Sequence, residues 1–374
     1  MTQQEVQQEE NKEKIRDQQW KRVRSILRQY SENSLAYLSL EPDKQWFFAE
    51  GFEGVASYAV SGHTMVICGD PICADDHFAA FLTQLRQFAA KHRYRIVFLM
   101  TMAKHLDAYQ AAGFGFHKSG EEAVFDVQTW SMAGGKCAKV RSSWHSAVHK
   151  GLTVKEYRPW DKRDPAIEAQ FIDITDQWLK GKHTARLQFA VGSLMLERPC
   201  DKRYFYAVDA KGVIQGINVL NPYRSGKAWI VDIMRRREGC PHGVMELLFH
   251  DIMAKLKAEG AEQVSLGAAP FYRTTAHPHA DLSERAEHYV YNHMNYMYGF
   301  KSLQQAKAKY NPKWQNIYIV CRPKHLSPWM EEAAFAVLDS HGFRDYVRSF
   351  LEMRRIEKDK KKKARQNKRL QRKE

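Results

Sequence analysis

One stretch of the chain, residues 228–270, changes its hydrophobic period twice and thereby limits the possible folds. Residues 228–234 (AWIVDIM) are mostly apolar and β-branched, which predicts a buried strand. Three arginines, a glycine and a proline follow and predict a basic loop. Apolar residues then recur at helical spacing over residues 244–256, and residues 263–266 resume a strand pattern. This order predicts a β-α-β unit whose helix N-terminus can face an anion at the loop.

A second copy of this pattern lies earlier in the chain. Residues 64–69 (TMVICG) are typical of a strand, residues 78–91 of an amphipathic helix and residues 96–100 of another strand. The segments that follow also match, since YQAAGF at residues 109–114 corresponds to YMYGF at residues 296–300. We interpret the two copies as an internal duplication, although periods of this length also arise by chance in α/β proteins.

The length and composition are those of a globular protein. The 374 residues suffice for two domains with their own cores, and 44% of them are hydrophobic. No apolar run approaches the ~20 residues that cross a bilayer, and the Gln/Glu-rich start is not typical of a secretory signal. Six cysteines without a CxxC pair indicate reduced thiols, so we expect a cytoplasmic protein.

Positive charge is concentrated near the C-terminal end. The formal net charge is +15, and residues 354–374 hold 12 Lys/Arg against 3 Asp/Glu. A tail this basic favours a polyanionic partner, either nucleic acid or an anionic membrane surface. The alternative is a solvated, disordered end that aids solubility.

The hydrophobic pattern and the composition divide the chain into five segments. We predict strands at residues 35–40 and 46–48, a long loop over residues 271–286 and a helix over residues 329–354. The predicted segments are an N-terminal helix (1–33), a first α/β domain (34–130), a basic linker helix (131–155), a second α/β domain (156–323), and a C-terminal helix with a basic tail (324–374).

Four charged residues are candidates for catalysis. Asp232 is predicted to end a buried strand, where a charge is costly without a partner. Arg235 follows three residues later, so an ideal strand would turn the two side chains to opposite faces unless the backbone bends. Glu121 and Glu122 are neighbours in a predicted strand, so we expect one to face the core and the other solvent. The alternative for all four is a structural role, as an ion pair or a strand-end turn.

Eight further residues have the chemistry to hold a phosphate, a base or a sugar. They are Arg141, Lys150, Arg236, Arg237, Lys307, Lys309, Lys313 and Trp314. The alternatives are a solvated linker helix for the first two and an exposed basic strand edge for the last four. Three histidines of the predicted long loop, His277, His279 and His288, lack the spacing and the partner ligands of a zinc site, so no metal is expected.

Five motifs, in order, resemble the C-terminal catalytic domain of the phosphatidylglycerol lysyltransferase (multiple peptide resistance factor) family over residues 34–323. The motifs are Gly69-Asp70-Pro71, GEEA at 120–123, DIMR at 232–235, LGAAP at 266–270 and KAKYNPKW at 307–314. The resemblance implies an α/β fold of two tandem GNAT-type domains with mixed sheets, here with helical N- and C-terminal extensions. It implies transfer of an aminoacyl group, lysyl favoured, from aminoacyl-tRNA to the hydroxyl of a lipid such as phosphatidylglycerol. No cofactor is implied, and the partners are aminoacyl-tRNA and the anionic inner face of the plasma membrane.

The resemblance also places Asp232 and Arg235 in the amino-acid pocket, where Asp232 would hold the substrate ammonium and Arg235 an ester oxygen or phosphate. The reaction needs alignment of ester and nucleophile, removal of a proton and stabilisation of an oxyanion. Two other functions remain open: a GNAT enzyme that uses acyl-CoA, and a duplicated scaffold that only binds RNA or an anionic membrane. The loop RRREGCPHG lacks the glycine pattern that binds the CoA pyrophosphate, which favours a tRNA or lipid phosphate there.

Overall fold

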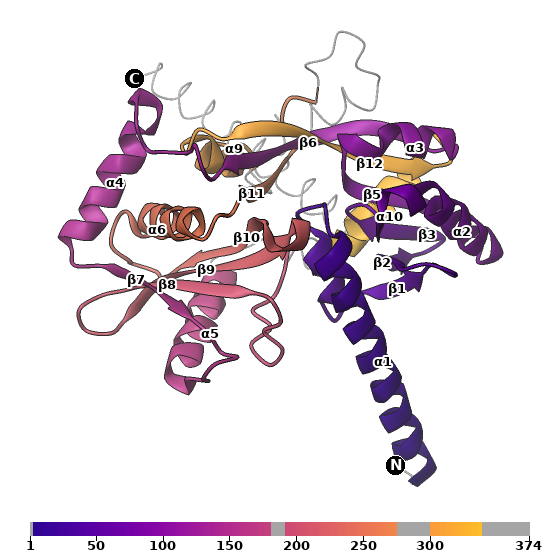
Figure 1. Cartoon of the computed structure of the whole chain (residues 1–374), viewed down its shortest axis with the longest axis horizontal. Coiled ribbons are helices and arrows are strands. Elements are labelled where there is room, and N and C mark those ends of the chain that lie inside the picture. Colours follow the sequence, from indigo (N-terminus) through magenta and orange to yellow (C-terminus); the bar gives the residue numbers. More distant parts are fainter. Residues whose placement is uncertain (1–2, 181–190, 275–299, 339–374) are drawn as a thin grey trace, which may run out of the picture.

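The computed structural model describes residues 3–180, 191–274 and 300–338. Twelve strands of these segments join in one mixed sheet (Figure 1). The strands are β1 (Gln45–Phe48), β2 (Gly54–Ser61), β3 (Thr64–Cys68), β4 (Ile72–Cys73), β5 (Arg95–Met102), β6 (Gly115–Asp126), β7 (Thr153–Tyr157), β8 (Arg203–Val208), β9 (Ile214–Tyr223), β10 (Ala228–Arg236), β11 (Gln263–Pro270) and β12 (Lys313–Arg322). The α-helices in this part of the chain are α1 (Gln3–Tyr30), α2 (Phe78–Lys91), α3 (Leu106–Ala111), α4 (Ala138–His149), α5 (Pro165–Lys180), α6 (Val244–Ala258), α9 (Phe300–Ala308) and α10 (Pro328–Leu338).

Both predicted β-α-β units are confirmed. β3 and β5 pair in parallel and are joined by α2, and β10 and β11 pair in parallel and are joined by α6. Each unit follows a run of antiparallel strands, β1-β2-β3 in the first half and β7-β8-β9-β10 in the second. This strand order is that of the GNAT fold, present twice, so the expected α/β class with a mixed sheet is confirmed.

The two halves exchange strands where they meet. The sheet order is β1-β2-β3-β5-β12-β6-β11-β10-β9-β8-β7, with β4 paired to β2. β12, from the second half of the sequence, therefore lies between β5 and β6 of the first half, and β6 pairs with β11 of the second. The strands before and after the predicted domain boundaries at residues 130 and 156 belong to one continuous sheet. The domain limits themselves stay a prediction.

Helices cover both faces of the sheet in the second half. α6 packs on one face in a core that includes Phe205, Leu220 and Val264, and α4 packs against α6. α5 packs on the other face through Phe171 and Ile174. The predicted linker helix is thus a helix, shorter than its predicted segment.

The N-terminal helix extends from Gln3 to Tyr30, as predicted, and projects away from the body (Figure 1). Its C-terminal part is buried through Val23, Ile26 and Leu27, because the apolar stripe of the sequence faces a core there. The prediction of a strand at residues 35–40 is wrong, since residues 36–40 form a 3₁₀-helix buried at every position. Periodicity cannot assign a short run that is apolar on all sides.

The C-terminal predictions are tested only in part. α10 confirms a helix that begins near residue 329, and it is described as far as Leu338. The rest of that predicted helix, the basic tail, residues 275–286 of the predicted loop and its three histidines lie outside the described residues. No helix within the described ranges is long and apolar enough to cross a membrane.

Candidate active site

Asp232 lies within β10 and not at its end, because the strand continues through Arg235 and Arg236. The pairing of β10 with β9 shifts its register between Val231 and Ile233. Asp232 is therefore the extra residue of a β-bulge, a feature that re-aims a side chain next to a site.

The bulge brings Asp232 and Arg235 to the same face of the sheet. The Asp232 carboxylate accepts a hydrogen bond of 3.0 Å from Asn221, which shares a face with Val219 two residues earlier. Arg235 pairs with Ile217, which shares that face too. The backbone irregularity that the two side chains need in order to share a site is therefore present, inside the strand.

A buried charge cluster surrounds the Asp232 carboxylate. Its Oδ1 accepts the backbone N–H of Gly192 at 3.1 Å, and Nζ of Lys202 lies 3.9 Å from its Oδ2. The same ammonium lies 3.3 Å from Oε1 of Glu41, and only 2% of the Lys202 side chain is exposed. Burial raises the pKa of Asp232 above its ordinary value, while the charge of Lys202 opposes that rise. Two carboxyl groups, of Asp232 and Glu41, therefore face the single ammonium of Lys202 in this cluster.

The loop that carries Gly192 closes over the carboxylate. A Cβ at residue 192 would lie 2.0 Å from Oδ2 of Asp232, so only glycine allows the backbone this close. Asp232 is thus enclosed by protein, and it does not line the groove described below.

Arg235 is directed toward α5. Its Nη1 donates to the Thr175 hydroxyl at 2.9 Å, and its guanidinium carbon lies 5.0 Å from the centroid of the Trp178 ring. The Arg235 side chain is buried, so its guanidinium group contacts Thr175 and Trp178 of α5 and has little contact with solvent.

A second polar cluster lies on the central strands, at the place where the halves exchange strands. Oε1 of Glu122 on β6 accepts hydrogen bonds from the hydroxyls of Ser34, at 2.6 Å, and Ser265. Nζ of Lys307, at the end of α9, donates to the carbonyl of Ala268. Lys307 is only 8% exposed, and burial lowers its pKa to about 7, against the opposing charge of Glu122. A lysine in this state exchanges its proton near neutral pH, as a general base or acid must.

Glu121 faces the other way from Glu122 and is buried, whereas Glu122 is partly exposed. Its Oε1 accepts from Lys118 at 2.7 Å, and its Oε2 lies 3.7 Å from a guanidinium nitrogen of Arg273. Only Glu121 is fully buried, which agrees with the expectation that one of the two glutamates faces the core. The ion pairs of Glu121 match the structural alternative for this residue.

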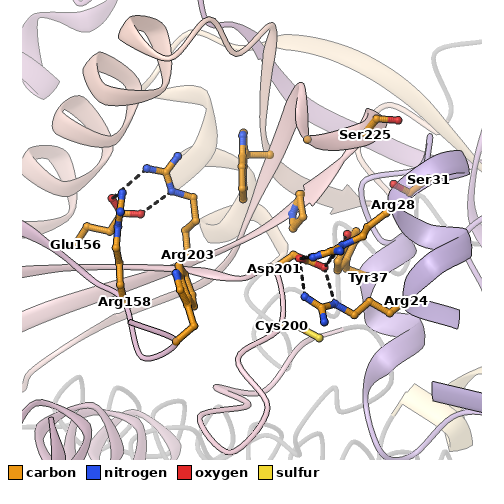
Figure 2. Close-up of a pocket in the computed structure, with 14 residues that line it drawn as sticks. Arg24, Arg28, Ser31, Tyr37, Glu156, Arg158, Cys200, Asp201, Arg203 and Ser225 are labelled. Atoms are coloured by element: carbon orange, nitrogen blue, oxygen red, sulfur yellow. Dashed lines mark hydrogen bonds and ion pairs between the residues drawn. The ribbon is translucent and has the colours of Figure 1, made fainter. Parts of the chain in front are cut away.

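A groove of about 810 Å³ lies between α1 and the strands β7 to β10. Figure 2 shows two groups of charged side chains on its opposite walls. Arg24 and Arg28 from α1 bind Asp201 on one wall, and Arg158 and Arg203 bind Glu156 on the other. Arg203 and Arg158 also pair with Glu259 and Asp161, so the excess of guanidinium groups over carboxylates lies on the α1 wall, where Arg24 and Arg28 share Asp201.

The groove and the two buried clusters meet at the end of β9. Pro222 lines the groove, its neighbour Asn221 reaches Asp232, and its other neighbour Tyr223 lies close enough to Glu122 to feel its charge. Burial first, and then that charge, raise the pKa of the Tyr223 hydroxyl. At the start of β8, the side chains of successive residues also point alternately to the groove and to a cluster. Asp201 and Arg203 line the groove, whereas Lys202 points into the Asp232 cluster.

Several of the predicted phosphate-binding residues are held in local contacts instead. Arg237 donates to a carboxylate oxygen of Asp173 at 2.6 Å, and Lys309 donates to Glu246 at 2.6 Å. Both contacts tie a loop or strand end to a neighbouring helix. Arg236 is exposed at the end of β10, where it remains a candidate.

The other basic candidates are scattered over the surface. Arg141 donates to two carbonyls of the loop that precedes its helix, and Lys150 is exposed just beyond α4. Lys313 is exposed at the start of β12, and the Trp314 ring packs 5.0 Å from that of Tyr272. The alternative of an exposed strand edge is wrong, because β12 lies inside the sheet.

Four residues of the two clusters were not among the predicted candidates: Ser34, Glu41, Lys202 and Ser265. No local pattern marks them, because they come from three separate parts of the chain, with Ser34 and Glu41 on either side of the 3₁₀-helix at residues 36–40. A signal that was available is the motif that contains Asp70, since Asn33 donates to Asp70 at 2.8 Å and thereby fixes the segment that carries Ser34.

The helix N-termini that would bind the CoA pyrophosphate in a GNAT enzyme are occupied or acidic here. A Cβ at Gly243, the residue before α6, would lie 1.8 Å from the carbonyl oxygen of Ser143, so α4 packs directly on this end of α6. The turn before α2 carries Asp75 and Asp76, which repel an anion. Neither end offers free space and positive charge together.

Fold and site together define a protein of the duplicated GNAT type. A sequence model described as phosphatidylglycerol lysyltransferase, C-terminal, matches residues 24–321, and the chain belongs to this family. It is 27% identical over 307 residues to the phosphatidylglycerol lysyltransferase of Bacillus subtilis, with 80% of this chain and 35% of that protein covered. The corresponding protein of Staphylococcus epidermidis is 27% identical over 305 residues, with coverage of 82% and 36%. The chain therefore spans about a third of the length of these relatives.

Two solved structures show the same fold. The structure of L-PGS from Bacillus licheniformis superposes with a TM-score of 0.70 at 24% identity, covering 80% of this chain and 90% of that one. The C-terminal domain of a protein assigned as a lysylphosphatidylglycerol synthetase from Agrobacterium fabrum superposes with a TM-score of 0.71 at 26% identity, with coverage of 87% and 96%.

Proposed function

We propose that this protein transfers an aminoacyl group, lysyl favoured, from an aminoacyl-tRNA to the hydroxyl of an anionic membrane lipid such as phosphatidylglycerol. The observation that carries the proposal is the family match over residues 24–321, which includes every residue of the two buried clusters. The relatives are phosphatidylglycerol lysyltransferases by name. An aminoacyl ester is already activated, so the protein needs only to align it, move a proton and stabilise charge.

Lys307 is the residue best suited to move the proton. As a neutral amine it accepts the proton of the lipid hydroxyl while the hydroxyl oxygen attacks the ester carbonyl. The resulting ammonium then returns the proton to the departing 3′ oxygen of the tRNA, so that the amine is neutral again. A pKa of about 7 suits both steps, and Glu122 nearby favours the ammonium as it forms.

The Asp232 cluster is suited to bind the ammonium of the transferred amino acid. Glu41 and Asp232 set two carboxyl groups against the one ammonium of Lys202 in a buried setting, which a second cation would complement. In the structure Gly192 closes this position, so we infer that the loop after residue 190 moves when the amino acid enters. Arg235 on the same face then supplies the positive charge for an ester oxygen or a phosphate.

The two competing functions have less support. An acyl-CoA enzyme needs a free helix N-terminus for the pyrophosphate, and Ser143 fills that place at α6. A scaffold that only binds RNA or membrane has no use for a buried lysine with a lowered pKa beside a glutamate.

The proposal is tested by incubating the purified protein with radiolabelled lysyl-tRNA and phosphatidylglycerol vesicles. We expect a labelled lipid on thin-layer chromatography, and a panel of other aminoacyl-tRNAs and lipids then defines the preference. A protein that labels no lipid with any aminoacyl-tRNA, but is stabilised against heat by acyl-CoA, would instead be an acyl-CoA-dependent enzyme.

A further inference from the structure

We propose that the groove between α1 and β7–β10 binds a single-stranded segment of RNA. The inference rests on the proposed function for the identity of that RNA, which would be the 3′ end of the aminoacyl-tRNA. The groove is separate from the buried clusters, and its volume of about 810 Å³ falls within the ~300–1,000 Å³ of typical ligand sites.

The charge of the groove suits a phosphodiester backbone. Arg24 and Arg28 converge on the single carboxylate of Asp201, at 2.9 Å and 2.5 Å. Although burial raises it, hydrogen bonds from these two arginines lower the pKa of Asp201 to about 2, so the carboxylate stays charged and holds both side chains in place. The Arg28 side chain remains 57% exposed, so much of its guanidinium group faces solvent. One carboxylate cannot neutralise two guanidinium groups, and the excess positive charge attracts phosphate.

The opposite wall carries the group that binds a base. Trp160 is 46% exposed although it is a large aromatic residue, and it lies in the groove beside Arg158, which is 51% exposed. Exposed tryptophan next to arginine is the combination on which unpaired bases stack. A flat membrane surface would not use a tryptophan inside a concave site. The C-terminal tail is positively charged, as the groove is, so the tail is not a suitable occupant either.

One of the residues that line the groove, Ser31, has a buried hydroxyl without a hydrogen-bond partner among the described residues. The residue is only 1% exposed. A buried polar atom of this kind is costly unless a ligand satisfies it, and a ribose hydroxyl or a phosphate oxygen has the right chemistry.

The position of the groove explains why RNA would bind there. Ser31 is followed three residues later by Ser34, which donates to Glu122, and three residues of chain span at most about 10 Å. Pro222 in the groove lies between Asn221, which contacts Asp232, and Tyr223, which lies near Glu122. The groove and the two clusters therefore share the chain segments at residues 31–34 and 221–223, which places an RNA end in the groove next to the elements that carry the clusters.

The test measures binding and not catalysis. The whole protein is titrated into a short fluorescein-labelled single-stranded RNA, and its affinity is read from fluorescence anisotropy. We expect Trp160→Ala and Arg28→Ala each to weaken binding about fivefold or more, because a stacked base or a phosphate contact is lost. Uncharged tRNA should compete with the labelled RNA, and blunt duplex RNA should not.

Matched controls separate the groove from general effects of charge and aromatic area. Trp329→Ala removes a tryptophan that is 65% exposed on α10, and Arg93→Ala removes an exposed arginine after α2. Both should leave RNA affinity unchanged, and circular dichroism should show that all four variants fold.

The inference is overturned if Trp160→Ala and Arg28→Ala bind RNA as well as the controls do. It is equally overturned if these variants keep RNA affinity but lose binding to phosphatidylglycerol vesicles, because the groove would then serve the lipid surface. A wild-type protein that aminoacylates no lipid while the groove variants still lose RNA binding would contradict the proposed function and leave the groove as an RNA site.

Discussion

Each half of the molecule buries one aspartate beside its β-α-β unit, and the two aspartates are bonded differently. Asp70 follows β3 and accepts hydrogen bonds from the Asn33 amide, the Met102 backbone N–H and the Tyr109 hydroxyl, all neutral donors at 2.8 to 3.1 Å. Asp232 on β10 instead shares the charge of Lys202 with Glu41. The Asp70 carboxyl group is satisfied by neutral donors, whereas at Asp232 two carboxyl groups share one ammonium, an arrangement that a substrate cation could complete. This difference is consistent with the proposal that Asp70 has a structural role and Asp232 binds substrate.

The largest effect is expected at Lys307, which lies between the halves. Lys307→Met keeps the length and the apolar character of the side chain but removes the proton acceptor, so we expect lipid aminoacylation to fall about 10²- to 10⁴-fold. The control is Lys257→Met, an exposed lysine on α6, which should keep wild-type activity. Equal activities in the two variants would remove Lys307 from the mechanism.

The same residue predicts the pH dependence of the reaction. Because the neutral amine is the active form and its pKa is lowered to about 7, the rate should rise through neutral pH and level off above it. A rate profile measured at constant lipid charge that is flat between pH 6 and 8 would contradict this role.

The comparison of Asp232 with Asp70 predicts different outcomes when each aspartate is replaced by asparagine. Asp232→Asn should reduce lysyl transfer about a hundredfold and raise KM for lysyl-tRNA, because the neutral amide no longer binds an ammonium. Asp70→Asn should leave the rate per folded molecule unchanged. If both variants lose activity equally at equal folded fraction, the two halves do not differ in the way we infer.

Asp70 should instead affect stability as a function of pH. Burial raises its pKa from 3.8 to about 6 in spite of the hydrogen bonds to Asn33, Met102 and Tyr109, so between these values the folded state binds more protons than the unfolded state. Stability therefore falls as pH rises from about 4 to about 6, by up to about 3 kcal/mol from this group. Urea unfolding of the wild type and of Asp70→Asn should show this slope in the wild type alone.

The smallest effect is expected at Lys309. Its ion pair with Glu246 is partly exposed, so Lys309→Ala should cost no more than about 1 kcal/mol of stability and leave RNA affinity unchanged. A marked loss of RNA affinity would restore this residue to the substrate-binding set, and anisotropy measurements decide between the two.

Local features of the molecule were predictable from the sequence, and long-range ones were not. The bounds of α6 follow from apolar spacing and from Gly243 and Gly260 at its ends, and those of α2 follow from apolar spacing, which are properties of neighbouring residues. The bulge at Asp232 depends on how β10 pairs with β9, and the partners Lys202 and Glu41 come from distant segments. Family resemblance pointed to Asp232, Glu122 and Lys307, but only the structure shows the cluster to which each belongs.

The position of β12 has a consequence for biosynthesis. This strand is the last of the described sheet to leave the ribosome, yet it fills the space between β5 and β6, which are made far earlier. The nascent chain must therefore hold those two strands with unpaired edges while more than half of the protein is still being translated. A ribosome that stalled before residue 313 would release a product with an open slot in the middle of its sheet, which is the kind of edge that chaperones bind and that aggregates form from.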